Sequence, residues 1–209
     1  MAGIYSLAIS SQVLNKEYEM NLTYKKVKYS EDKELFLRIE NLANSVFPPH
    51  EIVAPTMFRD YENDYVLLAF FDNDEFVGSG ALVPFENIIY LAFFVVDISK
   101  QNQGYGSAIL SLLKEIYKDK IIILESESII GEAFKNATNK KERLKRAKFY
   151  EKNAFKNYKI TNTYFGESYD IYANSDDEKV VFYYKKLYEF FKSKIDFKYT
   201  ITDENEATI

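Results

Sequence analysis

The 209-residue chain contains no cysteine and only one histidine, His50. Without cysteine there is no disulfide framework, no thiol nucleophile and no thiolate-bound zinc, which agrees with the cytoplasmic location that we expect. A single histidine cannot build a histidine-rich metal site, so we expect no metal. A serine–histidine–aspartate triad would have to use His50, which follows two prolines in an expected loop and has no accompanying serine elbow; we expect it at the surface.

Long apolar runs are missing as well. No segment approaches the roughly 20 apolar residues of a membrane-spanning helix, and the opening residues MAGIYSLAISS lack the positive region of a signal peptide. The formal charge is −5, and the basic residues gather in 135–159, where a solvated helix face explains them more simply than a nucleic-acid site. We therefore expect no membrane or nucleic-acid partner.

What the chain does contain is a strand, a turn and a helix in residues 91–118. An apolar run that is β-branched and aromatic ends at Val96, polar residues 97–103 interrupt it, and apolar residues then recur at helical spacing. Between them lies Gln101-x-x-Gly104-x-Gly106. Glycines let the main chain approach an anion, and the N–H groups of a first helical turn point at it. This pattern favours a bound diphosphate, and a tight turn without a ligand is the alternative.

Two common phosphate-binding motifs do not fit this turn. A Walker A loop needs a lysine after its last glycine, but Ser107 follows Gly106 directly; a dinucleotide fingerprint needs a third glycine where Ile109 stands. The turn instead resembles the acyl-CoA signature of the GNAT acyltransferases, Arg/Gln-x-x-Gly-x-Gly/Ala. In that family the signature follows a strand that ends in Val-Asp, as Val96-Asp97 does here.

A second segment carries the same resemblance. Residues 120–127 (KIIILESE) look like the family's next strand, and residues 146–155 (RAKFYEKNAF) look like its following helix, which usually ends in Phe/Leu-Tyr-Glu-x-x-Gly-Phe. The two motifs agree with the family in order and spacing over residues 90–156. The chain is therefore similar to bacterial-type GNAT N-acetyltransferases.

The order of the expected elements predicts an α/β (mixed α+β) fold, and the resemblance implies the GNAT fold: a single mixed, mostly antiparallel sheet flanked by helices on both faces. The expected strands are 22–27, 65–71, 75–83, 88–96, 120–127, 158–165 and 168–173. The expected helices are 30–46 with Ser30 as N-cap, a short one at 54–62, one from Gly106, 146–155, and one opened by a Ser175-x-x-Glu178 capping box. Hairpins are expected at 72–74 and 166–167, and 200–209 is expected to fray.

We expect one domain with extensions. Residues 1–19 form an N-terminal extension, residues 20–175 the acyltransferase domain, and residues 176–209 an amphipathic helix and tail packed on it. This aromatic last helix lies beyond the family minimum. Extra cover for the core is its first explanation and a dimer interface the second, so a monomer or a homodimer is expected.

The resemblance implies which residues carry acetyl transfer from acetyl-CoA to an amine. The main chain of Phe94, Val95 and Val96 would bind the pantetheine arm and the thioester carbonyl. The amides of the turn would hold the pyrophosphate; its residues are Gln101, Asn102, Gln103, Gly104, Tyr105, Gly106 and Ser107. Tyr150 matches the tyrosine that relatives place near the sulfur as general acid, and a packing role is its alternative in a chain with 18 tyrosines.

Three glutamates are candidates on the acceptor side. Glu125 and Glu127 stand two apart on one expected strand and so share a face. Glu125 is the candidate base, since a similar glutamate recurs at this strand in bacterial members, while Glu127 and the loop residue Glu51 are candidates for substrate binding. Plain solvent-facing carboxylates are the alternative.

Two positions depart from the family pattern: Arg143 replaces an asparagine that binds the arm in many relatives, and Ala154 replaces the glycine after the tyrosine helix. The expected activity is direct transfer in a ternary complex, because a chain without cysteine cannot form a cysteinyl intermediate. A small-molecule amine is the first expected acceptor, and a protein N-terminus or lysine the second. The alternatives are a non-catalytic acyl-CoA-binding module with the same fold and an interaction protein that uses its last helix.

Overall fold

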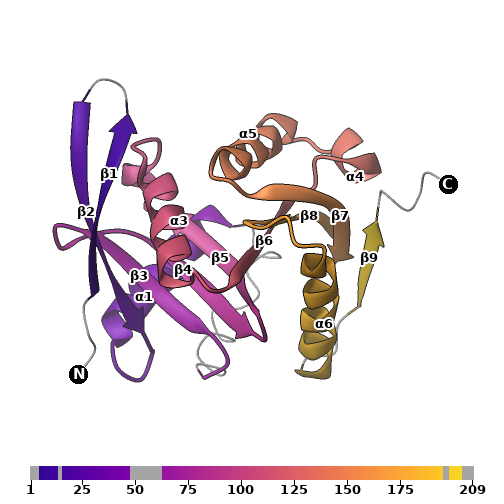
Figure 1. Cartoon of the computed structure of the whole chain (residues 1–209), viewed down its shortest axis with the longest axis horizontal. Coiled ribbons are helices and arrows are strands. Elements are labelled where there is room, and N and C mark those ends of the chain that lie inside the picture. The colour runs from indigo at the N-terminus through magenta and orange to yellow at the C-terminus, as the bar shows by residue number, and fades with distance from the viewer. Residues whose placement is uncertain (1–4, 14–15, 48–62, 195–197, 204–209) are drawn as a thin grey trace. The chain divides into compact units, whose positions relative to one another are not determined.

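The computed structural model describes residues 5–13, 16–47, 63–194 and 198–203, with side chains from Met20 onward. In this described part, nine strands form one sheet in the order β1-β2-β3-β4-β5-β6-β8-β7-β9 (Figure 1). The pairs β1–β2, β2–β3, β3–β4, β6–β8, β7–β8 and β7–β9 are antiparallel. The predicted mixed, mostly antiparallel sheet with helices is thereby confirmed.

The chain divides into two compact units. The first consists of residues 1–84 and 91–118, and the second of residues 85–90 and 119–209. Strand β5 (Ile88–Val96) gives its first three residues to the second unit and the rest to the first.

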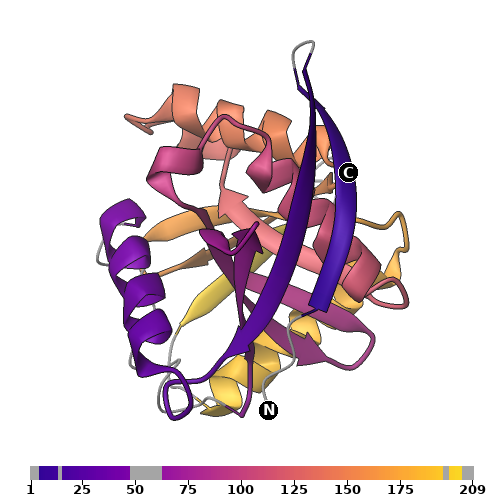
Figure 2. The ribbon, with the colours of Figure 1, turned by 90° about the vertical axis from the view of Figure 1, so that its left-hand side faces the viewer.

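The first unit begins with a long hairpin that sequence reasoning missed. Strand β1 (Tyr5–Val13) pairs with β2 (Lys16–Val27) along its whole length (Figure 2). The expected first strand at Leu22 therefore starts too late. Residues 16–19 read Lys-Glu-Tyr-Glu, which gives no apolar run that would predict a strand, yet their backbone pairs with β1 from Val13↔Lys16 onward.

Strand β2 pairs next with β3 (Val66–Asp72), which pairs with β4 (Glu75–Phe85). The hairpin expected between β3 and β4 is confirmed. Asn73 and Asp74 have φ angles of 47° and 67°, the left-handed values that both central residues of a type I′ turn require.

Helix α1 (Lys33–Val46) packs on these strands through Phe36 and Ile39. The predicted N-cap, Ser30, is wrong. Asp32 caps the helix, since its Oδ1 accepts the N–H of Leu35 at 3.1 Å while its Oδ2 lies 2.5 Å from the Nζ of Lys25 on β2. The hydrogen bond from Lys25 lowers the pKa of Asp32, and it ties the start of the helix to the sheet. The helix expected at 54–62 lies outside the described residues.

The second unit holds the remaining elements. They are β6 (Ile121–Glu127), α4 (Gly131–Lys135), α5 (Lys140–Lys152), β7 (Lys156–Tyr164), β8 (Glu167–Ala173), α6 (Lys179–Lys194) and β9 (Tyr199–Asp203). Helices α5 and α6 lie on opposite sides of β7 and β8 (Figure 1). Among the described residues, none of the helices has both the length and the apolar character that a membrane span needs.

Three expectations for this unit need correction. The short helix α4 was not predicted. The Ser175-x-x-Glu178 capping box is not formed, because Ser175 Oγ accepts the N–H of Asp177 and the helix begins only at Lys179. The fraying expected from residue 200 is wrong for β9, which pairs with β7 from Tyr164↔Tyr199 to Ile160↔Asp203. A polar strand at a sheet edge needs few apolar residues, so its sequence resembles that of a tail.

Candidate active site

The predicted phosphate-binding turn follows β5 in the first unit. Asp97 connects the turn to the sheet. Its backbone N–H donates to Val77 O on β4 at 3.0 Å, and its Oδ1 accepts the N–H of Ser99 in the turn at 3.0 Å. That carboxylate caps the 3-10 turn η1 (Ile98–Lys100). The Asp97 of the sequence motif therefore anchors the turn to the sheet.

Helix α3 (Tyr105–Ile116) begins at the end of this turn with no side-chain cap. Its N-cap is Gly104, with a φ of 92°, and Asn102 also lies in the left-handed region at 61°. The N–H groups of a first helical turn have no acceptor within the helix, and the helix dipole adds positive potential there. An uncapped helix start preceded by a glycine in this conformation is a suitable site for a phosphate.

The side chains of the turn brace it against the preceding residues. Gln101 Nε2 donates to Val96 O at 3.4 Å, and Gln103 Nε2 donates to Ser99 O at 2.7 Å. Neither Lys nor Arg occurs in 101–107. Binding of an anion here would therefore depend on backbone amides.

Strand β5 passes very close to β4 where the resemblance puts the pantetheine arm. A Cβ built on Gly78 would lie 2.6 Å from Val95 O, so only glycine fits at this position. Val95 is buried, whereas Phe94 and Val96 are partly exposed. All ten residues predicted to bind the donor thus lie in the first unit, on β5 and the turn after it.

Glu125 lies on β6 in the second unit and is surrounded by hydroxyl groups. Its Oε2 accepts hydrogen bonds from Tyr90 at 2.6 Å and Tyr164 at 2.9 Å, and its Oε1 accepts one from Tyr184. The hydroxyl of Tyr188 lies 2.8 Å from Oε1 and 3.0 Å from Oε2. These phenols come from β5, β7 and α6, so three elements hold one carboxylate.

The four phenols remain protonated over the physiological range. Burial, followed by the negative charge of Glu125, raises the pKa of each tyrosine well above its ordinary value. Each therefore keeps the proton that it donates to the carboxylate. We call Glu125 and these four residues the tyrosine cluster; its tyrosines are Tyr90, Tyr164, Tyr184 and Tyr188.

Tyr150 lies on the other face of this part of the sheet. Its ring packs on Tyr172 with centroids 5.7 Å apart, and Tyr172 pairs with Leu124, the neighbour of Glu125 on β6. Side chains alternate along a strand, so Tyr150 and Glu125 act on opposite faces. Burial raises the pKa of Tyr150 to about 12, and the charge of Arg146 opposes this rise.

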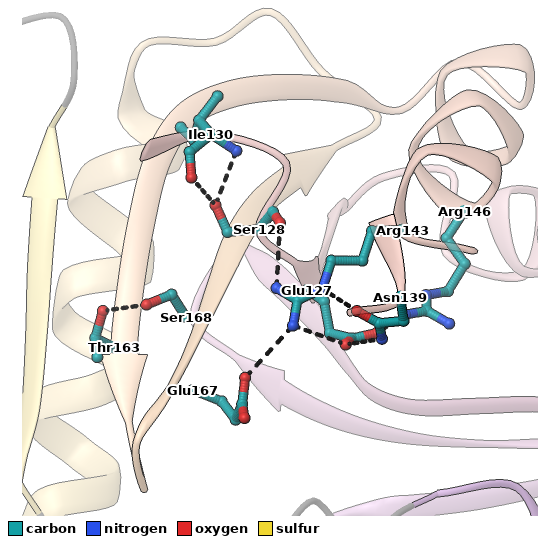
Figure 3. Close-up of polar contacts among 9 residues, drawn as sticks. All are labelled: Glu127, Ser128, Ile130, Asn139, Arg143, Arg146, Thr163, Glu167 and Ser168. Atoms are coloured by element: carbon teal, nitrogen blue, oxygen red, sulfur yellow. Dashed lines mark hydrogen bonds and ion pairs between the residues drawn. The ribbon is translucent and has the colours of Figure 1, made fainter. Parts of the chain in front are cut away.

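Glu127 lies among arginines at the end of β6 (Figure 3). Its Oε1 is 3.2 Å from Nη2 of Arg143 and accepts a hydrogen bond from Asn139 at 2.7 Å, while its Oε2 pairs with Arg146. An amine that bound Glu127 would compete with two guanidinium groups. Its role in substrate binding stays a prediction, as does that of Glu51, which lies outside the described residues with His50.

Arg143, one of the two departures from the family pattern, is 6% exposed and joins several segments. Its Nε donates to Asn139 Oδ1 at 2.7 Å, its Nη1 donates to Ser128 O at 3.3 Å, and its Nη2 lies 3.6 Å from Glu167 (Figure 3). Arg143 thus connects α5 to the end of β6 and the start of β8.

Restoring the family's asparagine in the variant Arg143→Asn is expected to destabilise the protein by about 1–3 kcal/mol, because it removes the buried contacts of Arg143 while Glu127 keeps Arg146 and Asn139. Asparagine is too short to reach Glu127 and Glu167. The measurement is urea denaturation, with Lys141→Ala on the exposed face of α5 as control, for which a change within about 0.5 kcal/mol is expected. Equal stability of Arg143→Asn and the parent would contradict this role.

The tyrosine cluster is what sequence reasoning missed. Tyr184 and Tyr188 appeared in it only as members of an apolar stripe on the last helix, yet both hydroxyls bind Glu125. The available signal was a pair of tyrosines at i and i+4 in that stripe, but their partner lies 59 and 63 residues away in the chain. Within the described residues, no group of three or more His, Cys, Asp or Glu side chains could hold a metal ion.

Solved structures with the same fold are numerous, and three show its range. A GNAT-family protein from Bacteroides thetaiotaomicron is 20% identical, with 81% of this chain and 96% of that chain covered and a TM-score of 0.64. The ribosomal-protein-S18-alanine N-acetyltransferase of Escherichia coli is 19% identical, with 75% of this chain and 97% of that chain covered and a TM-score of 0.53. An aminoglycoside 6'-N-acetyltransferase complexed with coenzyme A is 15% identical, with 71% of this chain and 94% of that chain covered and a TM-score of 0.51.

No curated protein matches the sequence. The family model for the Acetyltransferase (GNAT) family does match, over residues 36–134, which include β5, the turn at 101–107, α3 and β6. The predicted GNAT fold is confirmed by the structures above. The chain is thus similar in sequence to the GNAT family of acetyltransferases over residues 36–134, and it has the GNAT fold.

Proposed function

We propose that the protein transfers an acetyl group from acetyl-CoA to a primary amine by direct attack in a ternary complex. A small-molecule amine is the first acceptor to test, and a protein N-terminus or lysine the second. The observation that carries this proposal is the uncapped start of α3 behind Gly104, where backbone amides can take the pyrophosphate. A chain without cysteine, with no acyl-enzyme route through a thiol, suits direct transfer and a cytoplasmic location.

The turn at Gln101–Ser107 binds the diphosphate, and the main chain of Phe94–Val96 binds the arm and the thioester carbonyl. Glu125 receives the proton that the acceptor ammonium must lose before its nitrogen can attack. Attack forms the C–N bond, and collapse of the tetrahedral intermediate breaks the C–S bond and releases the thiolate of CoA. The second proton that the nitrogen loses to become an amide neutralises this thiolate, so the products are the acetylated amine and CoA.

Tyr150 would stabilise that thiolate mainly as a hydrogen-bond donor. An ordinary thiol has a pKa of about 8.5, about 3.5 units below that of Tyr150, so full proton transfer to sulfur would be uphill by about 5 kcal/mol. A hydrogen bond to a charged group contributes about 1.5–3 kcal/mol. We therefore propose that Tyr150 lowers the barrier to C–S cleavage while it keeps its proton.

The variant Tyr150→Phe is expected to lower the turnover number by about 10- to 100-fold and to leave acetyl-CoA affinity unchanged, because only the bond to the leaving sulfur is lost. With a pKa of about 12, the phenol is protonated at every ordinary assay pH, so the wild-type rate has no fall from Tyr150 below about pH 11. Steady-state kinetics and calorimetry measure the two quantities. Wild-type turnover by Tyr150→Phe would assign Tyr150 to packing alone.

The acceptor class is tested with four amines: an aminoglycoside with a free 6'-amine, a peptide that begins with alanine, a lysine peptide and spermidine. Two of them follow the acceptors named for similar structures. Released CoA is measured with a thiol reagent, which has no background from the enzyme because the chain lacks cysteine. Turnover of any amine supports an N-acetyltransferase. Tight acetyl-CoA binding with no turnover of amines would favour the non-catalytic acyl-CoA-binding module.

A further inference from the structure

The tyrosine cluster leaves little of the Glu125 carboxylate to an incoming amine. Oε2 lies within 3.0 Å of the hydroxyls of Tyr90, Tyr164 and Tyr188, while Oε1 accepts from Tyr184 and lies close to Tyr188. A carboxylate oxygen has two lone pairs, so phenols occupy the acceptor positions of both oxygens. An amine could reach either oxygen only by displacing a phenol.

The four phenols differ in their access to solvent. Tyr184 is 0% exposed, Tyr188 3% and Tyr90 6%, whereas Tyr164 is partly exposed. Tyr164 is the last residue of β7, next to the turn at Phe165 and Gly166. Its ring stacks on Tyr169, with centroids 4.8 Å apart and planes inclined by 22°. Of the groups that donate to Glu125, Tyr164 is therefore the one that a ligand can approach.

We propose that Tyr164 is a further catalytic residue, which takes the proton from the acceptor ammonium and passes its own to Glu125. This inference rests on the proposed function. An N–H bond of the ammonium breaks as a new O–H bond forms at Tyr164 Oη, and the original phenol proton moves across the 2.9 Å hydrogen bond to Glu125 Oε2. The ammonium becomes a neutral amine, the carboxylate becomes a carboxylic acid, and Tyr164 ends as it began.

The surroundings of Tyr164 suit this transfer. A phenol oxygen can accept a hydrogen bond while it donates one, so Tyr164 can receive one proton as it passes another to Glu125. Burial and the charge of Glu125 raise the pKa of Tyr164, so the proton that it passes on is present at neutral pH. Tyr90, Tyr184 and Tyr188 act as positioning residues, because their hydrogen bonds hold the carboxylate in place.

The test compares Tyr164→Phe with the wild type between pH 7 and 9.5, using acetyl-CoA and each of the four amines above. Phenylalanine keeps the stacked ring and removes only the hydroxyl. At pH 7 we expect kcat/KM for the amine to fall by about 100-fold, with the KM for acetyl-CoA unchanged. The variant reacts only with amine that arrives neutral. As the pH rises toward the pKa of the amine, the ratio of wild-type to variant kcat/KM is therefore expected to fall by up to about tenfold per pH unit.

Titration of the groups that face Glu125 does not explain a difference in kcat/KM that narrows as the pH rises. They are Tyr90 from β5, Tyr164 and Asn162 from β7, and Tyr184 and Tyr188 from α6; the phenols have raised pKa values and an amide does not titrate. Tyr158→Phe is the matched control, since its hydroxyl bonds to Ser175 O at 2.7 Å, apart from the cluster. It is expected to behave as the wild type at every pH.

Each outcome decides the matter. A deficit that narrows as pH rises supports the relay. A deficit that stays constant with pH, or no deficit, overturns the relay and leaves Tyr164 a structural residue, while the proposed function stands. No turnover of any amine by the wild type overturns the proposed function, and the relay falls with it.

Discussion

Replacement of Glu125 by glutamine is expected to lower the turnover number by about 10²- to 10⁴-fold, the usual contribution of a general base. The amide has nearly the shape of the carboxylate but cannot take up the proton of the amine. The surrounding phenols can accept hydrogen bonds as well as donate them, so they can adapt to the new NH2 group and the fold is expected to persist. Turnover with the amine panel and acetyl-CoA affinity are measured together, and only the turnover is expected to change.

The matched control for this variant is Glu86→Gln in the same unit. The Glu86 carboxylate lies 3.0 Å from Nζ of Lys186, and the side chains of both residues are 42% exposed. Such a surface pair contributes at most about 1 kcal/mol, so its loss is expected to leave turnover unchanged. Equal turnover in Glu125→Gln and Glu86→Gln would remove Glu125 from the chemistry.

Glu125→Gln also has a readout that needs no acceptor. The negative charge of Glu125 helps to raise the pKa of all four phenols, so its removal is expected to lower their pKa values in an ultraviolet titration at high pH. Burial is the larger cause and persists, so the values are expected to stay above the ordinary value for tyrosine. An unchanged titration would mean that the carboxylate does not contact the phenols in solution.

The variant Ser107→Asp, in the turn between β5 and α3, is expected to lose most of its affinity for acetyl-CoA. A carboxylate in the first turn of α3 suits the helix dipole, so the fold is expected to be as stable as before. The same charge would oppose a diphosphate. One added charge about 4 Å away costs about 4 kcal/mol near a protein surface, and less where salt screens it, so we expect acetyl-CoA affinity to fall by at least about 100-fold.

Ser107→Asn is the control, because it has the same shape as Ser107→Asp without the charge. We expect it to bind acetyl-CoA within about threefold of the wild type, since the main-chain amides are unchanged. Calorimetry gives the affinities and thermal unfolding gives the stabilities. If both variants lost affinity equally, shape rather than charge would limit binding, and a diphosphate at this helix start would be contradicted.

The turn could be predicted from sequence because its determinants are local. A β-branched strand, a polar break and two glycines lie within one short stretch, and each acts on neighbouring residues. The β3–β4 hairpin at Asn73 and Asp74 was predictable for the same reason. The N-cap of α1 was not, because Asp32 is selected over Ser30 by Lys25, a residue on another element.

The surroundings of Glu125 could not be predicted because they depend on long-range contacts. Its phenols come from positions 35 to 63 residues away in the chain, on three different elements. A pattern along one strand cannot show which side chains a helix brings to it. The same limit hid the ion pairs of Glu127, whose partners lie on α5.

Ala154 shows what a departure from the family pattern means physically. It follows α5 where relatives carry glycine, and its φ is 62°, in the left-handed region. The chain has kept the turn, with Phe155 N–H donating to Tyr150 O at 3.0 Å, although a non-glycine residue there costs about 1–2 kcal/mol. The backbone conformation after the tyrosine helix is therefore retained without the glycine.

Calorimetry of the wild-type protein shows whether the turn after β5 binds the diphosphate of an acyl-CoA. Acetyl-CoA, CoA and ATP are titrated separately. We expect micromolar binding of acetyl-CoA and CoA and none of ATP, which has phosphates but lacks the pantetheine arm assigned to Phe94–Val96. Absence of binding by either CoA species would contradict this expectation, and the turn would then be structural only.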